Sequence, residues 1–284
     1  MANYINPHAL VSTDWLADNL HQKNVVVLDA TWHLPTLQKD AKVDYNYAHI
    51  EGALYFDIDA VSDAASKLPH MLPSAAEFSA VIGALGINND SHVVVYDAYG
   101  LFSAARVWWM FRIFGHDKVS ILNGGSLKWL AEGRAMDDAN VTPSPTIFKA
   151  EFRPELVCNM DVILANIESK QSQVIDARAR NRFYAKVPEP RPDLRSGHIP
   201  NSISLPFNFL LDENSKELLS MDVLSTKFDA ENIDMARPII CSCGSGVTAC
   251  VLAFGLYLLG KDDALIYDGS WTEWGGSVET PIDI

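Results

Sequence analysis

Residues 240–260 have the sequence ICSCGSGVTACVLAFGLYLLG, which holds three structural signals in succession. A short apolar segment of strand length comes first, a glycine-rich turn follows Cys243, and a long apolar segment ends at Gly260. A strand that passes through a tight turn into a helix is the repeating unit of α/β proteins. The stretch therefore predicts an α/β fold and places a thiol where the strand ends.

The chain contains an earlier copy of this pattern. Four pairs of segments occur in the same order at offsets of 145 to 149 residues: VVVLDATW (25–32) with QVIDARAR (173–180), AHIEGALYFDID (48–59) with GHIPNSISLPFN (197–208), HVVVYDAYG (92–100) with RPIICSCGSG (237–246), and LNGGSLKW (122–129) with YDGSWTEW (267–274). A repeat of this length is a duplicated domain rather than a solenoid unit. Asp97 stands in the first copy where Cys243 stands in the second.

Apolar segments of strand length alternate with helical segments in both copies. In the first copy we expect strands at 25–28 and 93–96 and helices at 74–87 and 103–115. In the second copy we expect strands at 174–175 and 238–240 and a helix at 247–259. The strands lack polar alternation, which is typical of parallel strands buried on both faces. The predicted fold class is α/β, with a mostly parallel sheet flanked by helices in each of two tandem domains.

The two copies are separated by DDANVTPSPTIFKAEFRP (137–154), which contains three prolines and has no helical periodicity. We therefore expect a first domain at 1–140, a linker at 141–160 and a second domain at 161–284.

Composition limits the function classes. The chain has 284 residues, of which 48% are hydrophobic and 20% are charged, as in globular proteins. A net charge of −14 argues against nucleic acid and anionic membrane surfaces as partners. The chain shows neither a signal-peptide pattern nor an apolar stretch long enough to span a membrane. Four cysteines are too few for a disulfide scaffold, so a reducing, cytoplasmic location is expected.

The turn after Cys243 can stabilise a reactive thiolate. Backbone N–H groups and the positive end of the following helix would converge on one point there. Gly244 and Gly246 permit positive φ angles, and Ser245 and Thr248 add hydroxyl groups. Such surroundings favour the thiolate over the thiol. The alternative is a buried structural cysteine before an ordinary strand–helix turn.

Two other uses of such a cysteine are disfavoured. A cysteine phosphatase needs an arginine six residues after the nucleophile, and that position is Ala249. A zinc site needs a second ligand pair, which the Cys241-x-Cys243 sequence does not have at a suitable spacing. We expect neither a metal nor a cofactor. The remaining use of the cysteine is as a thiolate that accepts a neutral atom, such as a sulfur atom held as a persulfide.

The chain resembles the two-domain rhodanese-type sulfurtransferases over nearly its whole length. The resemblance rests on the loop CGSGVT (243–248) and on RVWWMFRIFG, HMLPS, GHIPNS and YDGSWTEW. In that family only the C-terminal domain carries the nucleophile, which agrees with Asp97 in the first copy. The resemblance implies a persulfide on Cys243. It also implies substrate contacts from the loop residues Gly244, Gly246, Val247 and Thr248.

The uncharged residues after Cys243 favour the 3-mercaptopyruvate branch of this family, because the thiosulfate branch typically has basic residues there. The expected reaction moves sulfur from 3-mercaptopyruvate to a thiol or cyanide and releases pyruvate. Thioredoxin is one candidate acceptor. Thiosulfate as the main donor is an alternative, and a non-catalytic rhodanese-like binding module is another.

The segment ARNRFYAKVPEPRPD (179–193) concentrates cations in an acidic chain. The resemblance implies that Arg182 and Arg191 hold the carboxylate and keto oxygen of mercaptopyruvate, and a guanidinium suits a carboxylate because it binds in a planar, bidentate way. From the residues alone, a solvated loop surface is the alternative. Because the loop is polar and proline-rich, substituting either arginine should leave thermal stability unchanged. Arg178 is expected to pair with Asp176.

The resemblance also implies a proton relay made of Asp59, His70 and Ser245, with the first two contributed by FDIDAVSDAASKLPHM (56–71). Such a relay would help to remove the proton of the donor thiol or would adjust the protonation of Cys243.

Overall fold

The computed structural model describes residues 4–284 and contains two five-stranded parallel sheets, one in each half of the chain. The strands of the first sheet, in spatial order, are β1 (Leu10–Val11), β6 (Val119–Leu122), β5 (His92–Tyr96), β2 (Val25–Asp29) and β4 (Leu54–Tyr55). Those of the second are β10 (Ile203–Ser204), β9 (Gln173–Asp176), β11 (Ile239–Ser242), β12 (Leu265–Tyr267) and β8 (Val157–Cys158). An antiparallel pair, β3 (His49–Ile50) with β7 (Met136–Asp137), lies beside the first sheet.

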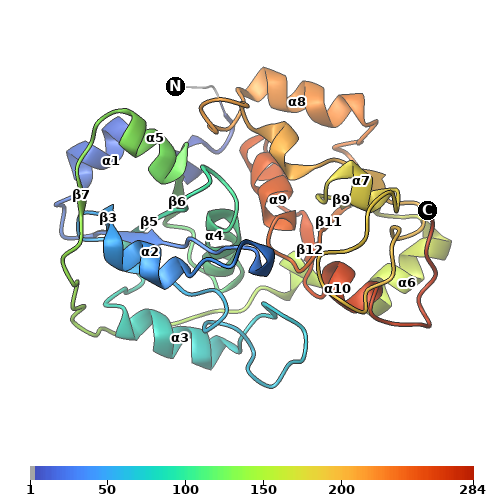
Figure 1. Ribbon diagram of the computed structural model, residues 1–284, viewed down its shortest axis with the longest axis horizontal. Coiled ribbons are helices and arrows are strands. Elements are labelled where there is room, and N and C mark those ends of the chain that lie inside the picture. The colour runs from blue at the N-terminus through green and yellow to red at the C-terminus, as the bar shows by residue number, and fades with distance from the viewer. Residues whose placement is uncertain (1–3) are drawn as a thin grey trace.

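Helices surround both sheets, and the two halves form two lobes that lie side by side (Figure 1). The helices of the first half are α1 (Thr13–Asn19), α2 (Ala41–Tyr47), α3 (Ala75–Ala84), α4 (Ala104–Ile113) and α5 (Gly125–Ala131). Those of the second half are α6 (Met160–Ser169), α7 (Arg180–Phe183), α8 (Met221–Ala230), α9 (Ala249–Leu258) and α10 (Ser270–Trp274). Short 3₁₀ turns include η2 (Pro35–Leu37) and η4 (Phe207–Leu210).

The two halves meet along α4 and α9, which follow the equivalent strands β5 and β11. Nearly every residue of both helices is buried, because each helix faces its own sheet on one side and the other half on the opposite side. The Trp108 ring of α4 packs against Phe254 and Tyr257 of α9 at centroid distances of 4.8 and 5.3 Å. One apolar cluster continues across both halves as a result. The two sheets are thereby joined through the helices that follow β5 and β11.

The predicted fold class is confirmed, and each predicted strand overlaps an observed one. Two helix boundaries differ for local reasons. The helix expected at 247–259 begins at Ala249, because Val247 and Thr248 belong to the loop. The helix expected at 74–87 ends at Ala84, since Gly86 has a φ of +76° that an α-helix cannot contain. Gly115 ends α4 as expected, with a φ of +84°.

The chain between the halves, residues 138–153, is irregular and packs along α3. The N–H of Thr146 donates to the carbonyl oxygen of Gly83 at 2.8 Å, and Ala150 N donates to Ser79 Oγ at 3.0 Å. Among residues 4–284, no helix is long and apolar enough to cross a membrane.

Candidate active site

The loop that carries Cys243 leaves the end of β11 and enters α9, and α10 holds it in place. Trp271 N donates to the carbonyl oxygen of Cys243 at 3.0 Å, and Thr272 N donates to that of Gly244 at 2.9 Å. The N–H of Cys243 donates to Ser270 Oγ at 3.2 Å. These three bonds fix the first two residues of the loop, so the direction of the Cys243 side chain is set by backbone contacts.

The equivalent loop in the first half shows what this geometry can bind. The carboxyl group of Asp97 accepts from the backbone N–H groups of Tyr99, Phe102 and Ala104 at 2.8, 2.7 and 2.8 Å. Burial raises the pKa of Asp97, and these N–H donors oppose that rise. In the second half, no backbone N–H of residues 244–248 has an acceptor within the described chain. The loop at Cys243 therefore keeps its donors available for an anion.

A cavity of about 470 Å³ opens beside Cys243 and is lined by both halves of the chain. The second half contributes the loop residues Gly244, Ser245, Val247 and Thr248, together with arginines and prolines from 178–192. The first half contributes Trp32, Leu34, Pro35, Thr36 and Phe102. The Cys243 loop therefore faces residues of the first half across this cavity. Gly246 is not among the lining residues and supports the loop from behind.

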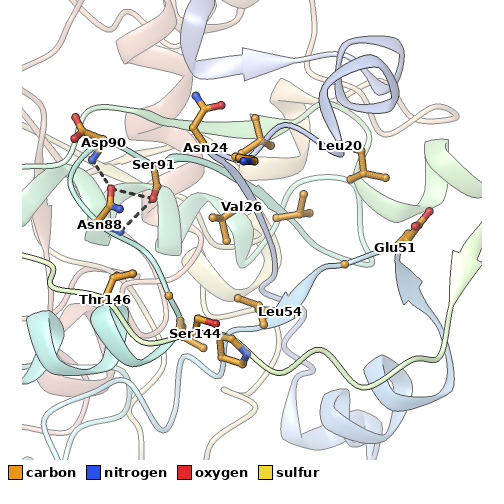
Figure 2. Close-up of a pocket in the computed structure, with 17 residues that line it drawn as sticks. Leu20, Asn24, Val26, Glu51, Leu54, Asn88, Asp90, Ser91, Ser144 and Thr146 are labelled. Carbon is orange, nitrogen blue, oxygen red and sulfur yellow. Dashed lines mark hydrogen bonds between the residues drawn. The ribbon is translucent and has the colours of Figure 1, made fainter.

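A second cavity, of about 510 Å³, lies on the first half alone (Figure 2). Its lining includes Asn88, Ser91, Ser144 and Thr146, and Ser91 is hydrogen-bonded to Asn88. None of the described residues that line it is a cysteine or an arginine. It therefore has no thiol for sulfur chemistry, and the one cation among these described residues, Lys23, shares the cavity with Glu51 and Asp90.

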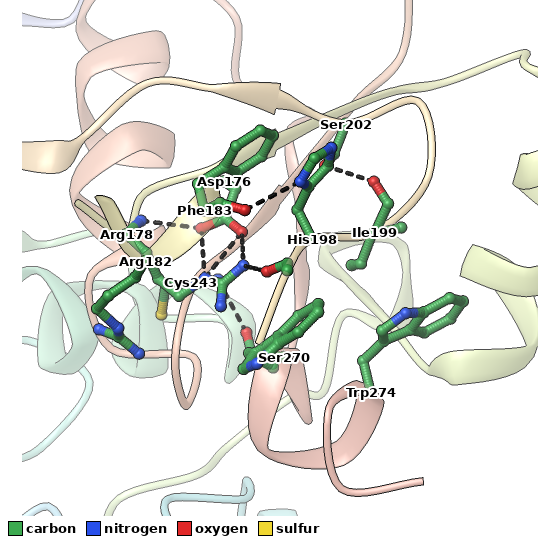
Figure 3. Close-up of polar contacts among 12 residues, drawn as sticks. Asp176, Arg178, Arg182, Phe183, His198, Ile199, Ser202, Cys243, Ser270 and Trp274 are labelled. Carbon is green, nitrogen blue, oxygen red and sulfur yellow. Dashed lines mark hydrogen bonds and ion pairs between the residues drawn. The ribbon is translucent and has the colours of Figure 1, made fainter. Parts of the chain in front are cut away.

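Arg178 lies directly behind the Cys243 loop and is fully buried (Figure 3). Its guanidinium contacts the Asp176 carboxylate at 2.6 Å and Glu189 Oε1 at 2.8 Å, and it donates to the Gly197 carbonyl oxygen at 2.8 Å. It also stacks over the Trp271 ring at 4.1 Å. The predicted pairing with Asp176 is confirmed, and the saturated donors of Arg178 make it a structural residue.

Arg182 lines the cavity and is held by the same carboxylate, Glu189, through its second oxygen. A Cβ atom on Gly244 would lie 3.3 Å from the Arg182 guanidinium, so the absence of a side chain there leaves room for it. The Glu189 side chain is only 1% exposed. The structure removes the basis for expecting that substitution of Arg182 leaves thermal stability unchanged, because Glu189 is a buried charge that would lose one partner.

Arg191 lines the cavity from the proline-rich segment, and its guanidinium has no carboxylate within 4.0 Å in the described part of the chain. Its neighbour is His70 Nε2, at 3.5 Å. Burial lowers the pKa of Arg191, while the nearby Cys243 has the opposite, smaller effect. Of the two arginines predicted to bind substrate, Arg191 has the more available positive charge.

Asp59 and His70 lie together next to Arg191. His70 Nδ1 is 3.0 Å from Asp59 Oδ1, and Trp32 Nε1 donates to Asp59 Oδ2 at 2.8 Å. Burial lowers the pKa of His70, which favours the neutral ring, and the hydrogen bond from His70 lowers the pKa of Asp59. The His70 ring thus faces Asp59 with Nδ1 and Arg191 with Nε2.

Ser245 is separate from this pair. It lines the cavity as part of the Cys243 loop, and no hydrogen bond joins it to His70 or Asp59 within residues 4–284. The structure thus brings two of the three predicted relay residues into contact and places the third beside the thiol.

The amino-acid sequence matches the Rhodanese-like domain family twice, at residues 12–132 and 159–277. The chain belongs to the rhodanese family. Its two rhodanese domains coincide with the two halves described above, and the loop of the second one carries the cysteine.

Relatives with known names are similar along almost the whole chain. The "Thiosulfate/3-mercaptopyruvate sulfurtransferase 1, mitochondrial" of Arabidopsis thaliana is 46% identical over 96% of this chain and 78% of its own length. The "Thiosulfate sulfurtransferase" of Bos taurus is 45% identical over 96% of this chain and 94% of its own. The crystal structure of SseA from Escherichia coli, described as a 3-mercaptopyruvate sulfotransferase, superimposes with a TM-score of 0.85 and 39% identity, covering 93% of this chain and 98% of that one. This rhodanese is therefore an enzyme of the sulfurtransferase kind.

Sequence reasoning missed part of this rhodanese site. Glu189 was overlooked because an isolated glutamate between prolines gives no sign of burial. The aromatic wall formed by Trp32, Phe102 and Phe207 was also missed. Its residues come from three separate loops, and only the meeting of the two halves brings them together.

Proposed function

We propose that this sulfurtransferase takes sulfur from 3-mercaptopyruvate, holds it as a persulfide on Cys243 and passes it to a thiol or to cyanide. The observation that carries the proposal is the Cys243 loop, whose residues 244–248 bear no charge and have N–H groups without an acceptor in the described chain, beside a cavity that also holds an available guanidinium. A cradle of N–H groups stabilises a thiolate and a persulfide anion alike.

The first half-reaction would begin when the Cys243 thiolate attacks the sulfur of mercaptopyruvate. The new S–S bond forms as the donor C–S bond breaks, and its electron pair goes to the pyruvate enolate, which then takes a proton. In the second half-reaction an acceptor thiolate attacks the outer sulfur, and the Cys243 thiolate leaves. No external oxidant or reductant is required. Thioredoxin and small thiols fit the second step equally.

Substrate binding would fall to the arginines and the loop. We assign the substrate carboxylate and keto oxygen to Arg191 and Arg182. Arg191 is supported by its lack of a direct ion pair, and Arg182 by its orientation toward Gly244. The N–H groups of Gly244, Val247 and Thr248 would surround the transferred sulfur, and Gly246, which does not line the cavity, would support the loop from behind. An uncharged loop suits a donor whose single negative charge lies on its carboxylate, away from the sulfur.

We assign proton transfer to Asp59, His70 and Ser245. Asp59 orients the neutral ring of His70, as a carboxylate does in other acid–base pairs, so that Nε2 can accept a proton. Ser245 would offer its hydroxyl next to the sulfur. We also propose a cytoplasmic location, because all four cysteines are free thiols buried in the protein, as expected in a reducing compartment.

Mass spectrometry tests the central step. Incubation with 3-mercaptopyruvate should add one sulfur atom to Cys243, and incubation with thiosulfate should add less under the same conditions. Cys243→Ser should accept none and should have no turnover, because no other thiol lines the cavity in the described chain. Added sulfur on Cys158 or Cys250, or normal turnover in Cys243→Ser, would refute the mechanism. Faster loading by thiosulfate would overturn the choice of donor only.

A further inference from the structure

Arg106 connects the two halves of the molecule at a point directly behind the active site. It belongs to α4 of the first half and is 1% exposed. Its guanidinium contacts the Asp268 carboxylate of the second half at 2.7 Å and donates to the carbonyl oxygen of Gly246 at 3.3 Å. Its other terminal nitrogen donates to the carbonyl oxygen of His70. One side chain thus binds the backbone of the cysteine loop and the backbone of the proposed base.

Both residues whose carbonyl groups receive these bonds have left-handed backbone conformations. His70 has a φ of +61°, which costs free energy for a residue with a side chain and persists only where the surroundings enforce it. Gly246 has a φ of +73°, and a Cβ atom there would lie 2.8 Å from the Asp268 carbonyl oxygen and 3.1 Å from the Arg106 guanidinium. The Asp268 carbonyl oxygen and the positive φ together require glycine at this position, and the Arg106 guanidinium packs tightly against it.

Asp268 completes the connection. Its first carboxylate oxygen binds Arg106, and its second accepts from the N–H of Leu72, two residues beyond His70, at 2.9 Å. The segment 70–72 of the first half is therefore bound at one end by Arg106 and at the other by a residue of the second half. The pair is buried, since the side chains of Arg106 and Asp268 are 1% and 6% exposed.

We propose that Arg106 is a positioning residue that sets the place of His70 relative to the Cys243 loop. It fixes the left-handed turn that aims the His70 ring at Arg191, and its bond to the Gly246 carbonyl oxygen sets the position of that turn relative to the Cys243 loop. The inference rests on the roles proposed above for His70 and Cys243. Arg106 itself lies outside the cavity lining and would act only through these two backbone segments.

Lysine at position 106 is the sharpest substitution. Arg106→Lys keeps the positive charge that the buried Asp268 requires, so the fold should persist. A single ammonium group lacks the planar fork and cannot serve both carbonyl oxygens at once. Arg106→Met is the more severe companion variant. Both are to be measured in the wild-type background and in a His70→Gln background.

The measurement is kcat/KM for 3-mercaptopyruvate together with the rate of sulfur loading of Cys243 in a single turnover. If Arg106 works by placing His70, Arg106→Lys should lower both by about tenfold in the wild-type background, mainly through kcat. In the His70→Gln background the same substitution should lower them by less than about threefold, because residues that act as one unit are not additive. Equal losses in both backgrounds, or no loss in either, would overturn the inference.

Arg195→Lys is the matched control. Arg195 is also partly buried and donates to the carbonyl oxygens of Gly275, Trp274 and Thr280 at 3.2, 3.0 and 3.0 Å, far along the chain from the relay segment. It should lose stability without losing kcat per folded molecule. A similar kinetic loss in Arg195→Lys would reduce Arg106 to a general structural role. If the wild-type enzyme itself fails to load sulfur, the proposed function is refuted, and the inference about Arg106, which rests on it, is refuted with it.

Discussion

The replacement of Arg191 by alanine is the most direct test of how the substrate carboxylate is bound. Arg191 lines the cavity beside Cys243, and the described structure gives it no carboxylate partner within 4.0 Å. Its guanidinium is therefore free to bind the donor carboxylate. Each hydrogen bond to an ionised group contributes about 1.5–3 kcal/mol. One lost contact of that size lowers kcat/KM by about 10- to 150-fold.

We expect Arg191→Ala to lower kcat/KM for 3-mercaptopyruvate within that range, while its melting temperature changes little because no ion pair is broken. Arg182→Ala should behave differently. It removes one partner of the buried Glu189, which keeps only Arg178, so its melting temperature should fall along with activity. Arg191→Lys should recover part of the activity, since an ammonium supplies charge without the bidentate geometry.

Steady-state release of pyruvate measures the effect, with Arg180→Ala as the control. Arg180 lies in the same segment but outside the cavity lining, where it pairs with Glu231. Kinetics for Arg191→Ala that match the wild type, or a loss no larger than that of Arg180→Ala, would return Arg191 to a solvated surface role. Thiosulfate carries no carboxylate, so Arg191→Ala should lower kcat/KM for thiosulfate by a different factor from kcat/KM for mercaptopyruvate.

Two further outcomes are expected. In the pH profile of kcat/KM, activity should fall on the acid side below pH 6.5, because the active base is the neutral ring and burial lowers the pKa of His70 from that value. His70→Gln should remove this acid-side fall. A fall that begins above pH 6.5 would exclude His70 as the base. Asp97→Asn should lower the free energy of unfolding by about 1–3 kcal/mol, since an amide nitrogen would face backbone N–H donors. Chemical denaturation measures that loss, activity per folded molecule should persist, and an unchanged midpoint would contradict the account of the first loop.

The sequence predicted the fold well because the duplication supplied the same evidence twice. The unbroken apolar segments at 25–28 and 93–96 could only be buried strands, and both lie in the observed first sheet. The loop after Cys243 was also predictable, because glycine and hydroxyl residues next to a strand end restrict the possible backbone geometry. The conformation of such segments depends mainly on residues that are close in sequence, so the sequence alone predicts it.

The contacts across the two halves could not be predicted. Arg106 stands in a helix that is apolar apart from it and Arg112. Its partners, His70, Gly246 and Asp268, lie 36, 140 and 162 residues away in sequence. The state of Arg182 depends in the same way on the burial of Glu189. The sequence shows which segments carry charged residues. Only the packing of the two halves shows which of those residues already have an ion-pair partner.

The carboxyl group of Asp97, held by three N–H groups of its own loop, acts as a ligand tethered to its site. Its effective concentration there is far above that of any dissolved anion, so the first loop stays permanently occupied. The second loop has the same backbone plan without the tethered group. One molecule thus contains two copies of the same loop, one filled by its own side chain and one whose N–H donors remain available to a bound group.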